Sequence, residues 1–264
     1  MDFSLSIVAA VVLMLVVMSV TWLLAKRWDN YSIVDAAWAG SFAIIALFFA
    51  LTQPGLLLRK TLMLFAVGIW SLRLAIFLTR RIRSHHPVED SRYQQLRAEY
   101  GKHAPARFFL FFQYQALSVV LLAIPFLEVF RSDIGSLSGV EIAGFLLICL
   151  SLIGESIADA QAQKFKQNPE NKNKTCQVGL WRYSRHPNYF FESCVWWGFY
   201  LFAIGAAGAY YTVYAPLIIL FLLLKVTGVP PSEAAALKKR GEEYRRYQQT
   251  TSMFVPWFPK KDPH

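Results

Sequence analysis

The stretch GLWRYSRHPNYFFESCVWWGFY, residues 179–200, carries a dense group of hydrogen-bonding side chains directly into an apolar segment. Its polar half contains two arginines, a histidine, an asparagine and two tyrosines, and Glu192 follows beside Phe190 and Phe191. A carboxylate placed in hydrocarbon costs about 3 kcal/mol, so Glu192 marks a candidate functional site. The alternative is a carboxylate at a helix end that extends to water.

The regions on both sides of this stretch are apolar over lengths that match a lipid bilayer. Of the 264 residues, 55% are hydrophobic and 16% are aromatic, which is typical of a polytopic membrane protein. Because a helix rises about 1.5 Å per residue, about 20 apolar residues cross a hydrocarbon core of about 30 Å. We therefore predict an all-α fold with seven transmembrane helices, over residues 5–24, 33–51, 62–78, 108–129, 139–160, 192–207 and 211–224.

The basic residues indicate the orientation of these helices. The net charge of +10 is divided among the connecting segments and forms no continuous face, so we expect no nucleic-acid partner. Most lysines and arginines fall in alternate connections and in the C-terminal tail, whereas the opposite side has Arg59, Lys60 and Arg131. This asymmetry predicts an outside N-terminus and a cytoplasmic C-terminus.

No linker or repeat divides the chain, so we predict one transmembrane helical domain over residues 1–264. The first apolar run has no basic residues before it and no small-residue cleavage site after it, so we expect a retained helix. The three cysteines, Cys149, Cys176 and Cys194, show no close spacing. Neither a disulfide framework nor a metal site is indicated.

Ionisable residues inside the predicted helices are candidates for function. Tyr31, Asp35 and Trp38 share one helix face, and desolvation should raise the affinity of Asp35 for its proton. The alternative is a helix N-terminal charge, with Ser32 available as a cap. Arg73 should face the bundle interior or a fixed anion, or else act as a structural ion-pair partner.

The polar stretch and the helix before it offer the groups that a nucleotide cofactor needs. Basic side chains suit phosphates, aromatic rings can stack on a planar ring, and Asn188 with Glu192 suits an amide. Glu155 and Asp159 lie four residues apart on one helix face that continues to Lys166. Because no Gly-x-Gly-x-x-Gly or Walker-type loop is present, the cofactor would lie between transmembrane helices.

The C-terminal tail has helix-forming composition over residues 233–246, after Pro230 and Pro231. Leu237 and the neighbouring basic side chains predict an interfacial helix. The alternative is electrostatic attraction to anionic lipid alone.

Residues 155–259 resemble the integral-membrane steroid 5α-reductase family, and the whole chain is similar to a bacterial group within it. The matching residues are Gly179, Leu180, Tyr183, Asn188, Tyr189 and Glu192, followed by Glu242, Tyr244 and Pro256. The Arg-His-Pro-Asn-Tyr core is also similar to that of sterol reductases and isoprenylcysteine carboxyl methyltransferases. The resemblance implies NADPH-dependent reduction of an enone such as a 3-oxo-4-ene steroid, in the inner membrane of a bacterium, with the cofactor site facing the cytoplasm.

The resemblance also implies where the sites lie. The substrate would be held mainly by residues 1–130 and NADPH mainly by residues 155–259. Cofactor contacts are expected at Asp159, Lys166, Trp181, Arg182, Tyr183, Arg185, His186, Asn188, Tyr189, Glu192, Glu233, Arg240 and Tyr244. Phe191 stands where the family usually has glycine, Trp70 replaces a substrate-side tyrosine, and the family's Gln-Glu pair near the second helix is absent.

We assign the catalytic role of that missing glutamate to Asp35 with Tyr31, and place Arg73 near the reaction. Hydride addition to an enone leaves negative charge on the carbonyl oxygen, and a protonated Asp35 could stabilise it. Two other functions are considered: a membrane methyltransferase that uses S-adenosylmethionine, and a lipid carrier or transporter. The expected partners are a steroid-like or other flat enone lipid and the membrane lipid, and we expect a monomer.

Overall fold

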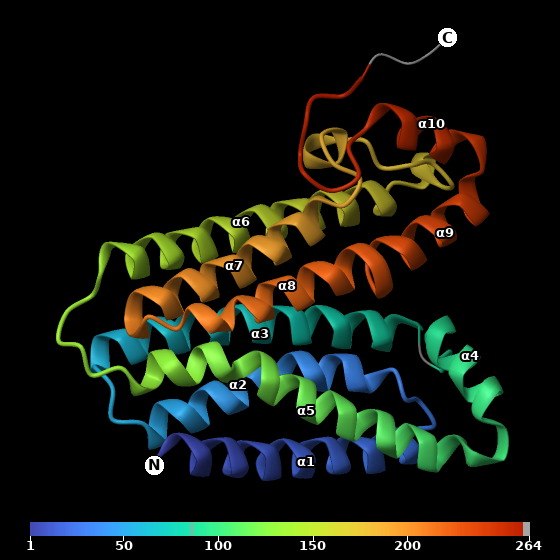
Figure 1. The fold of residues 1–264 in the computed structure, drawn as a ribbon. Helices are drawn as coiled ribbons and strands as arrows, with labels where there is room; N and C mark the ends of the chain where they lie inside the picture. The colour runs from blue at the N-terminus through green and yellow to red at the C-terminus, as the bar shows by residue number, and fades with distance from the viewer. Residues whose placement is uncertain (86, 261–264) are drawn as a thin grey trace. The chain divides into compact units, whose positions relative to one another are not determined.

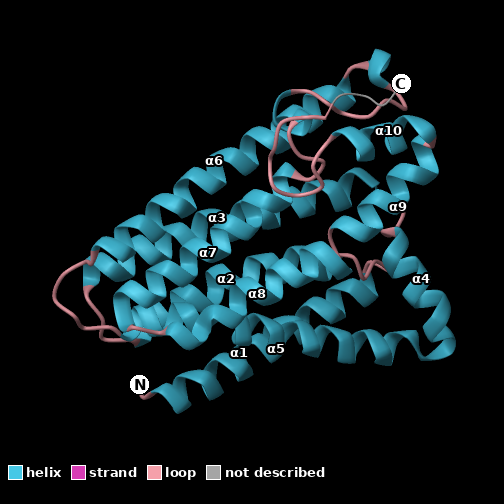
Figure 2. Ribbon diagram, turned by 45° about the horizontal axis from the view of Figure 1, so that its top comes forward, coloured by secondary structure: helices cyan, strands magenta, loops and turns pink. Residues whose placement is uncertain are grey.

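The computed structural model describes residues 1–85 and 87–260, and these residues are helical or irregular, with no strand among them (Figures 1 and 2). The α-helices are α1 (Phe3–Arg27), α2 (Ile33–Thr52), α3 (Leu57–His85), α4 (Ser91–Tyr100), α5 (Ala104–Arg131), α6 (Gly139–Gln167), α7 (Pro187–Ala207), α8 (Tyr214–Phe221), α9 (Val229–Arg240) and α10 (Glu242–Thr250). Short 3-10 turns occur at Gly101–His103, Pro169–Asn171, Gly179–Arg182 (η3) and Tyr210–Val213, and Leu222–Val226 is π-helical.

Seven helical stretches in the described part of the chain are long and apolar enough to cross a membrane, which confirms the predicted fold class. They cover Phe3–Arg27, Ile33–Thr52, Leu57–Ser84, Ser91–Arg131, Gly139–Gln167, Pro187–Ala207 and Tyr210–Arg240. The structure therefore describes an all-helical, multi-pass membrane protein.

The chain divides into two compact units. Unit one comprises Met1–Ser138 and Gly205–Ala209, and unit two comprises Gly139–Ile204 and Tyr210–His264. Unit one contains residues 1–130, which were assigned to the substrate, and unit two contains residues 155–259, which were assigned to the cofactor, except for Gly205–Ala209. The prediction of a single domain stays a prediction.

Unit one is built from α1, α2, α3 and α5, which run alongside one another, and from α4. Its core contains Trp70, which is fully buried and meets the ring of Phe42 at a centroid distance of 5.1 Å. The hydroxyl of Ser71 links α3 to α2, because it donates to the carbonyl of Ala39 and accepts from the amide of Ala43. Trp70, where the family has a substrate-side tyrosine, is a core residue of this unit.

In unit two, α6 and α7 approach closely through glycines. A Cβ atom on Gly144 would lie 2.7 Å from the amide nitrogen of Phe202, and one on Gly198 would lie 2.9 Å from the carbonyl oxygen of Gly144. Small residues permit such close contact between membrane helices. Further along, Phe191 packs on Gly154, where an added Cβ would lie 2.5 Å from the ring. The absence of a Cβ at Gly154 thus makes room for the ring of Phe191 on the facing helix.

Several boundaries differ from the sequence prediction: α3 spans Leu57–His85 rather than residues 62–78, and α5 and α6 are also longer than predicted. Helix α7 begins at Pro187 rather than at residue 192, since proline lacks an N–H and suits the first helical position. The predicted tail helix over residues 233–246 is wrong in extent, because the tail forms two helices, α9 and α10, that meet at Gly241. Gly241 has a φ of 51°, a conformation that glycine adopts without steric cost.

Candidate functional site

The polar stretch, residues 179–192, packs on α6 in unit two through the turn η3. Gly179 has a φ of 57°, and a Cβ atom there would overlap the side chain of Gln161. The same Gln161 accepts from the amide of Leu180 at 2.9 Å, and the indole N–H of Trp181 donates to the carbonyl of Ala158 at 2.8 Å. Trp181, predicted to stack on a cofactor ring, therefore has a structural contact in this docking.

The segment after α10 folds back over the polar stretch and is joined to it by backbone groups. Tyr183 accepts from the amide of Trp257 at 2.9 Å, and Arg185 donates through its own amide to Ser252 at 2.8 Å. The hydroxyl of Tyr247 donates to the carbonyls of Trp181 and Ser184. Residues 181–185, α10 and the segment after it are far apart in the sequence, yet they form one polar assembly.

A buried ion pair lies at the centre of this assembly. The guanidinium of Arg185, which is 9% exposed, donates from Nε to Glu233 Oε1 at 2.7 Å. Its Nη1 also donates to the carbonyls of Gln248 and Thr251. The other oxygen of Glu233 accepts from the side-chain amide of Gln248 at 2.9 Å. Arg185 and Glu233, both expected to contact the cofactor, thus have protein partners that tie α7 to α9 and α10.

His186 is buried beside this pair. Its ring stacks on Tyr189 with a centroid distance of 5.3 Å and an interplanar angle of 1°. Burial lowers the pKa of His186, and this outweighs the opposing effect of Glu233, whose carboxylate lies 3.3 Å from Nε2. The imidazole is therefore neutral near pH 7, and a contact between a positive His186 and a phosphate is not favoured.

Asn188 and Glu192 lie one helical turn apart at the start of α7, in agreement with their spacing in the sequence. Glu192 accepts from the indole N–H of Trp196 at 3.0 Å. The Oδ1 atom of Asn188 is buried, and no hydrogen-bond donor reaches it from the described residues. Buried polar atoms without a partner are rare in folded proteins, so this oxygen is a candidate ligand contact.

Two further buried donors in unit two lack partners among the residues that the structure describes. They are Nε of Arg240 and the hydroxyl of Thr175, a residue that is 6% exposed. The amide of Thr175 donates to Glu243 at 2.7 Å, and the guanidinium of Arg240 lies 5.2 Å from the ring centroid of Tyr244. Both groups therefore lie at the junction of α9 and α10. Nothing in the sequence around Thr175 signals this position.

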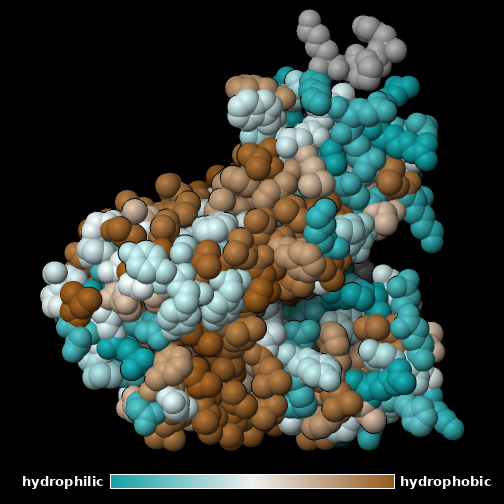
Figure 3. Space-filling model, in the orientation of Figure 1, coloured by the Kyte–Doolittle hydropathy of each residue, from teal (hydrophilic) through white to brown (hydrophobic). Residues whose placement is uncertain are grey.

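The remaining cofactor candidates of unit two are at least partly accessible. Lys166, Arg182 and Tyr183 are exposed, whereas Asp159 and Tyr189 are half-buried. Hydrophilic side chains gather around α10 in Figure 3, in contrast to the apolar surfaces of the long helices. Lys166 and Arg240 both act electrostatically on Cys176, the neighbour of Thr175, so positive charge lies at this end of unit two.

In unit one, Asp35 joins α2 to α4. Its carboxylate accepts from Arg92 Nη2 at 2.6 Å and from the hydroxyl of Tyr93 at 2.6 Å. Ser32 does not cap α2 with its side chain; its hydroxyl accepts from the amide of Asp90 instead. Arg92 and Tyr93 lie 57 and 58 residues from Asp35, so no local pattern in the sequence pairs them with it.

Tyr31 and Arg73, the other catalytic candidates, lie in different surroundings. Tyr31 is 3% exposed and stacks on Phe108 at a centroid distance of 4.0 Å. Its amide donates to Glu89 at 2.6 Å, and burial raises the pKa of its hydroxyl. Arg73 is half-buried within α3. No interaction described within unit one brings Tyr31, Asp35 and Arg73 together.

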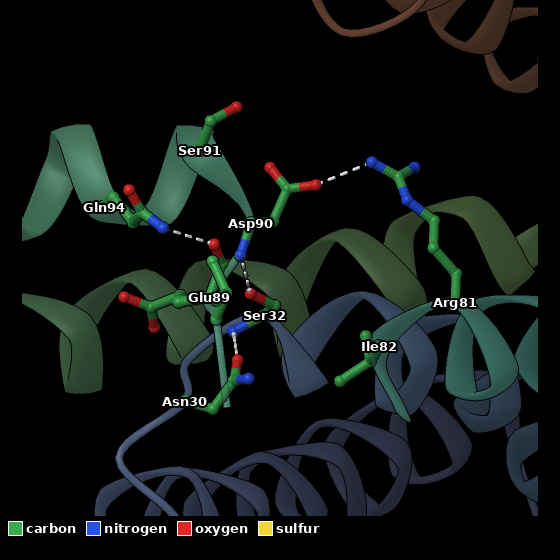
Figure 4. Close-up of a pocket in the computed structure, with 9 residues that line it drawn as sticks. Asn30, Ser32, Arg81, Ile82, Glu89, Asp90, Ser91 and Gln94 are labelled. Atoms are coloured by element: carbon green, nitrogen blue, oxygen red, sulfur yellow. Dashed lines mark hydrogen bonds and ion pairs between the residues drawn. The ribbon is translucent and has the colours of Figure 1, made fainter. Parts of the chain in front are cut away.

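A cavity of about 300 Å³ opens beside this region of unit one. Figure 4 shows that Arg81 pairs with Asp90 across it and that Gln94 donates to the backbone of Glu89. The lining residues are Asn30, Ser32, Arg81, Ile82, Val88, Glu89, Asp90, Ser91 and Gln94. These polar contacts hold α4 against the start of α2 and the end of α3.

The fold and the buried polar groups define a multi-pass helical membrane protein with a candidate ligand site in its C-terminal half. The chain belongs to the family described as "Protein of unknown function (DUF1295)", whose sequence model matches residues 21–251. It is also 25% identical over 279 residues to the "Uncharacterized protein C594.04c" of Schizosaccharomyces pombe, covering 94% of this chain and 79% of the yeast protein. No solved structure matches the chain.

Proposed function

We propose that the protein is an NADPH-dependent reductase that acts on the C=C bond of an enone in a flat, steroid-like lipid. The observation that carries the proposal is the buried, unpartnered Oδ1 of Asn188, one helical turn from Glu192. The resemblance to the steroid 5α-reductase family, which rests on Asn188, Tyr189 and Glu192 among other residues, supports the same assignment.

The residues of unit two fit the chemical groups of NADPH. The amide N–H groups of a nicotinamide need acceptors, and Asn188 Oδ1 is an acceptor that the described protein atoms leave unused. Phosphate oxygens need donors, and the buried Nε of Arg240 and hydroxyl of Thr175 supply two. Exposed Lys166 and Arg182 add positive charge, and Tyr183, also exposed, offers a ring face. We therefore assign the nicotinamide to Asn188 and Glu192, and the phosphates to the basic side chains.

When bound, NADPH would supply a hydride for the β-carbon of the enone. The chain's part in this reaction is to bind and orient. The ion pair between Arg185 and Glu233 fixes the start of α7 against α9 and α10, and so fixes where Asn188 is presented. Such support matters because an error of about 1 Å in position can lower a rate about 100-fold.

The proposed proton donor to the enolate is Asp35, with Tyr31. Arg92 and Tyr93 both donate to Asp35, which explains its carboxylate as a link between α2 and α4. A role as acid would require a proton on this carboxylate. Substitution of Asp35 tests this role.

We also propose that the protein lies in a bacterial inner membrane with the cofactor site facing the cytoplasm. The support is the distribution of basic residues in the sequence, with Lys166, Arg182 and the tail on one side.

Calorimetric titration of the purified full chain in lipid nanodiscs tests the cofactor assignment. The wild type should bind NADPH, and Asn188→Ala should weaken binding at least about tenfold, which corresponds to about 1.4 kcal/mol. Asn173→Gly is the control, because Asn173 is exposed and its φ of 68° suits glycine. Equal affinity in the wild type and Asn188→Ala would refute the site.

The titration also separates the competing functions. Binding of S-adenosylmethionine in place of NADPH would support the methyltransferase alternative, and binding of neither would support a lipid carrier. Oxidation of NADPH by the wild type in the presence of a 3-oxo-4-ene steroid would establish the reaction.

A further inference from the structure

The segment over residues 251–260 presents an apolar face away from the protein. It is an irregular loop with several bends, and its two ends meet, because the amide of Lys260 donates to the carbonyl of Thr250 at 2.8 Å. Phe254 points inward and meets the ring of Phe190 at a centroid distance of 5.8 Å. Met253, Val255, Trp257 and Phe258 are 40%, 54%, 69% and 76% exposed. A segment in water usually shows the reverse pattern, with its apolar side chains turned inward.

The segment is held firmly in this orientation. The carbonyls of Ser252 and Phe254 accept from the amide of Arg185 and the hydroxyl of Ser184, at 2.8 Å in each case. The amide of Trp257 donates to Tyr183 at 2.9 Å. Because hydrogen bonds hold the backbone at several points along its length, the apolar side chains are kept exposed by the fold of unit two.

The segment also lies close to the end of a membrane-crossing helix. Tyr183, bonded to Trp257, is four residues before Pro187, where α7 starts. An extended chain spans at most about 3.6 Å per residue, so Tyr183 is within about 15 Å of that start. Phe254 is closer still, because it contacts Phe190 in the first turn of α7. The polar layer of a bilayer is about 5–7 Å thick on each side of the hydrocarbon.

We propose that the outward face formed by Met253, Val255, Trp257 and Phe258 seats in the headgroup layer of the membrane leaflet at which α7 begins. Tryptophan is enriched at this depth because its ring is apolar and its indole N–H is polar. Exposed Arg182 and Lys260 lie at or near the same segment and suit anionic phospholipid headgroups. The proposal is independent of the reductase function, since it depends only on this surface and on α7.

The outward position of Trp257 can be measured with a spin label on the full chain. The label is attached at Trp257→Cys, in a background where Cys149, Cys176 and Cys194 are replaced by alanine. The protein is reconstituted in nanodiscs of phosphatidylcholine and phosphatidylglycerol. Accessibility to oxygen, which concentrates in lipid, is then compared with accessibility to a water-soluble nickel chelate.

A label at position 257 should favour oxygen over the nickel chelate by several-fold. The matched control is Glu242→Cys, an exposed position on α10 outside the segment, and its label should favour the chelate. Equal water accessibility at positions 257 and 242 would overturn the proposal. Strong coupling between labels on different chains would also overturn it, because the face would then be covered by a second copy.

A second experiment uses a variant without a spin label, so that its result does not depend on any disturbance by the nitroxide. In Trp257→Ser with Phe258→Ser, phosphatidylglycerol should protect the segment from added protease less than it protects the wild type. The same protection in both proteins would contradict the seating of these side chains in lipid. A protein that fails to fold would be recognised by loss of the helical circular dichroism, in which case Phe258→Ser alone is used.

Discussion

The carboxylate of Asp35 has two explanations that single substitutions can separate. In the structure it accepts from Arg92 and Tyr93, and the ion pair is partly exposed, with side-chain exposures of 46% for Arg92 and 32% for Asp35. Partly exposed pairs contribute about 0.2–1 kcal/mol, so the loss of this link alone should be tolerated. A general acid, in contrast, typically accounts for about 100-fold or more in rate.

We expect Asp35→Asn to lower NADPH oxidation about 100-fold or more if Asp35 is the acid, with a melting temperature close to that of the wild type. Arg92→Gln is the control, because it breaks the same ion pair and leaves the carboxyl group in place. If both variants keep near-wild-type turnover, Asp35 is a structural link only. Steady-state rates with a 3-oxo-4-ene steroid provide the measurement.

Some contacts of single residues could be predicted from the sequence, and others could not. The spacing of Asn188 and Glu192 fixed their relation on α7, because helical periodicity is a local property. The partners of Arg185 could not be found in this way, since Glu233 is 48 residues away and Thr251 is 66 residues away. Charge alone suggested a phosphate contact for Arg185, whereas a buried guanidinium needs fixed partners, and the tail provides them.

Helices α6 and α7 contact each other at Gly154 and Phe191. The ring of Phe191 occupies the space over Gly154, where a Cβ would lie 2.5 Å from ring carbons. The hydrophobic runs predicted both helices, because length and composition are sufficient for that. The pairing of one glycine with one phenylalanine depends on the rotation of each helix, which those runs leave undetermined.

We expect Gly154→Ala to destabilise the protein by about 1–3 kcal/mol, because the added methyl group overpacks the contact with Phe191. The second substitution Phe191→Leu should recover much of this loss in Gly154→Ala, since a smaller side chain makes room. Gly68→Ala on α3 is the matched control, as no atom lies within 4 Å of its added Cβ. Thermal unfolding in detergent is measured for the wild type, both single variants, the double variant and the control, and additive effects at positions 154 and 191 would contradict the contact.

The molecule as a whole combines membrane-crossing helices with a polar assembly that depends on long-range pairs. The seven crossing stretches were predicted from the sequence, because each is an independent run of apolar residues. The folded-back tail was not predicted, since its contacts join η3, α7, α9 and α10. Gly241 was visible in the sequence, but whether a glycine ends a helix depends on packing such as that of Tyr244 and Tyr247.

The same assembly gives the stability of the protein a dependence on pH. Burial lowers the pKa of His186 below its usual value of 6.5; Arg185 lowers it further, and Glu233 acts in the opposite direction. In the unfolded chain this histidine takes up a proton first as the pH falls, so protonation favours unfolding. Neutral His186 makes its full contribution to the free energy of unfolding above about pH 6.5. This contribution is lost as the pH falls from there towards the lowered pKa.

We therefore expect the melting temperature of the wild type to fall between pH 7.5 and pH 5.5 by more than that of His186→Gln, a variant that cannot titrate at this position. A shift of one pKa unit corresponds to about 1.4 kcal/mol, which is large enough to resolve by thermal unfolding. His103→Gln is the control, because His103 is exposed and lies outside this assembly. The pH profile of this control should follow the wild type. If His186→Gln follows it too, the folded chain does not hold His186 in the neutral form, and its stack on Tyr189 must tolerate a charged ring.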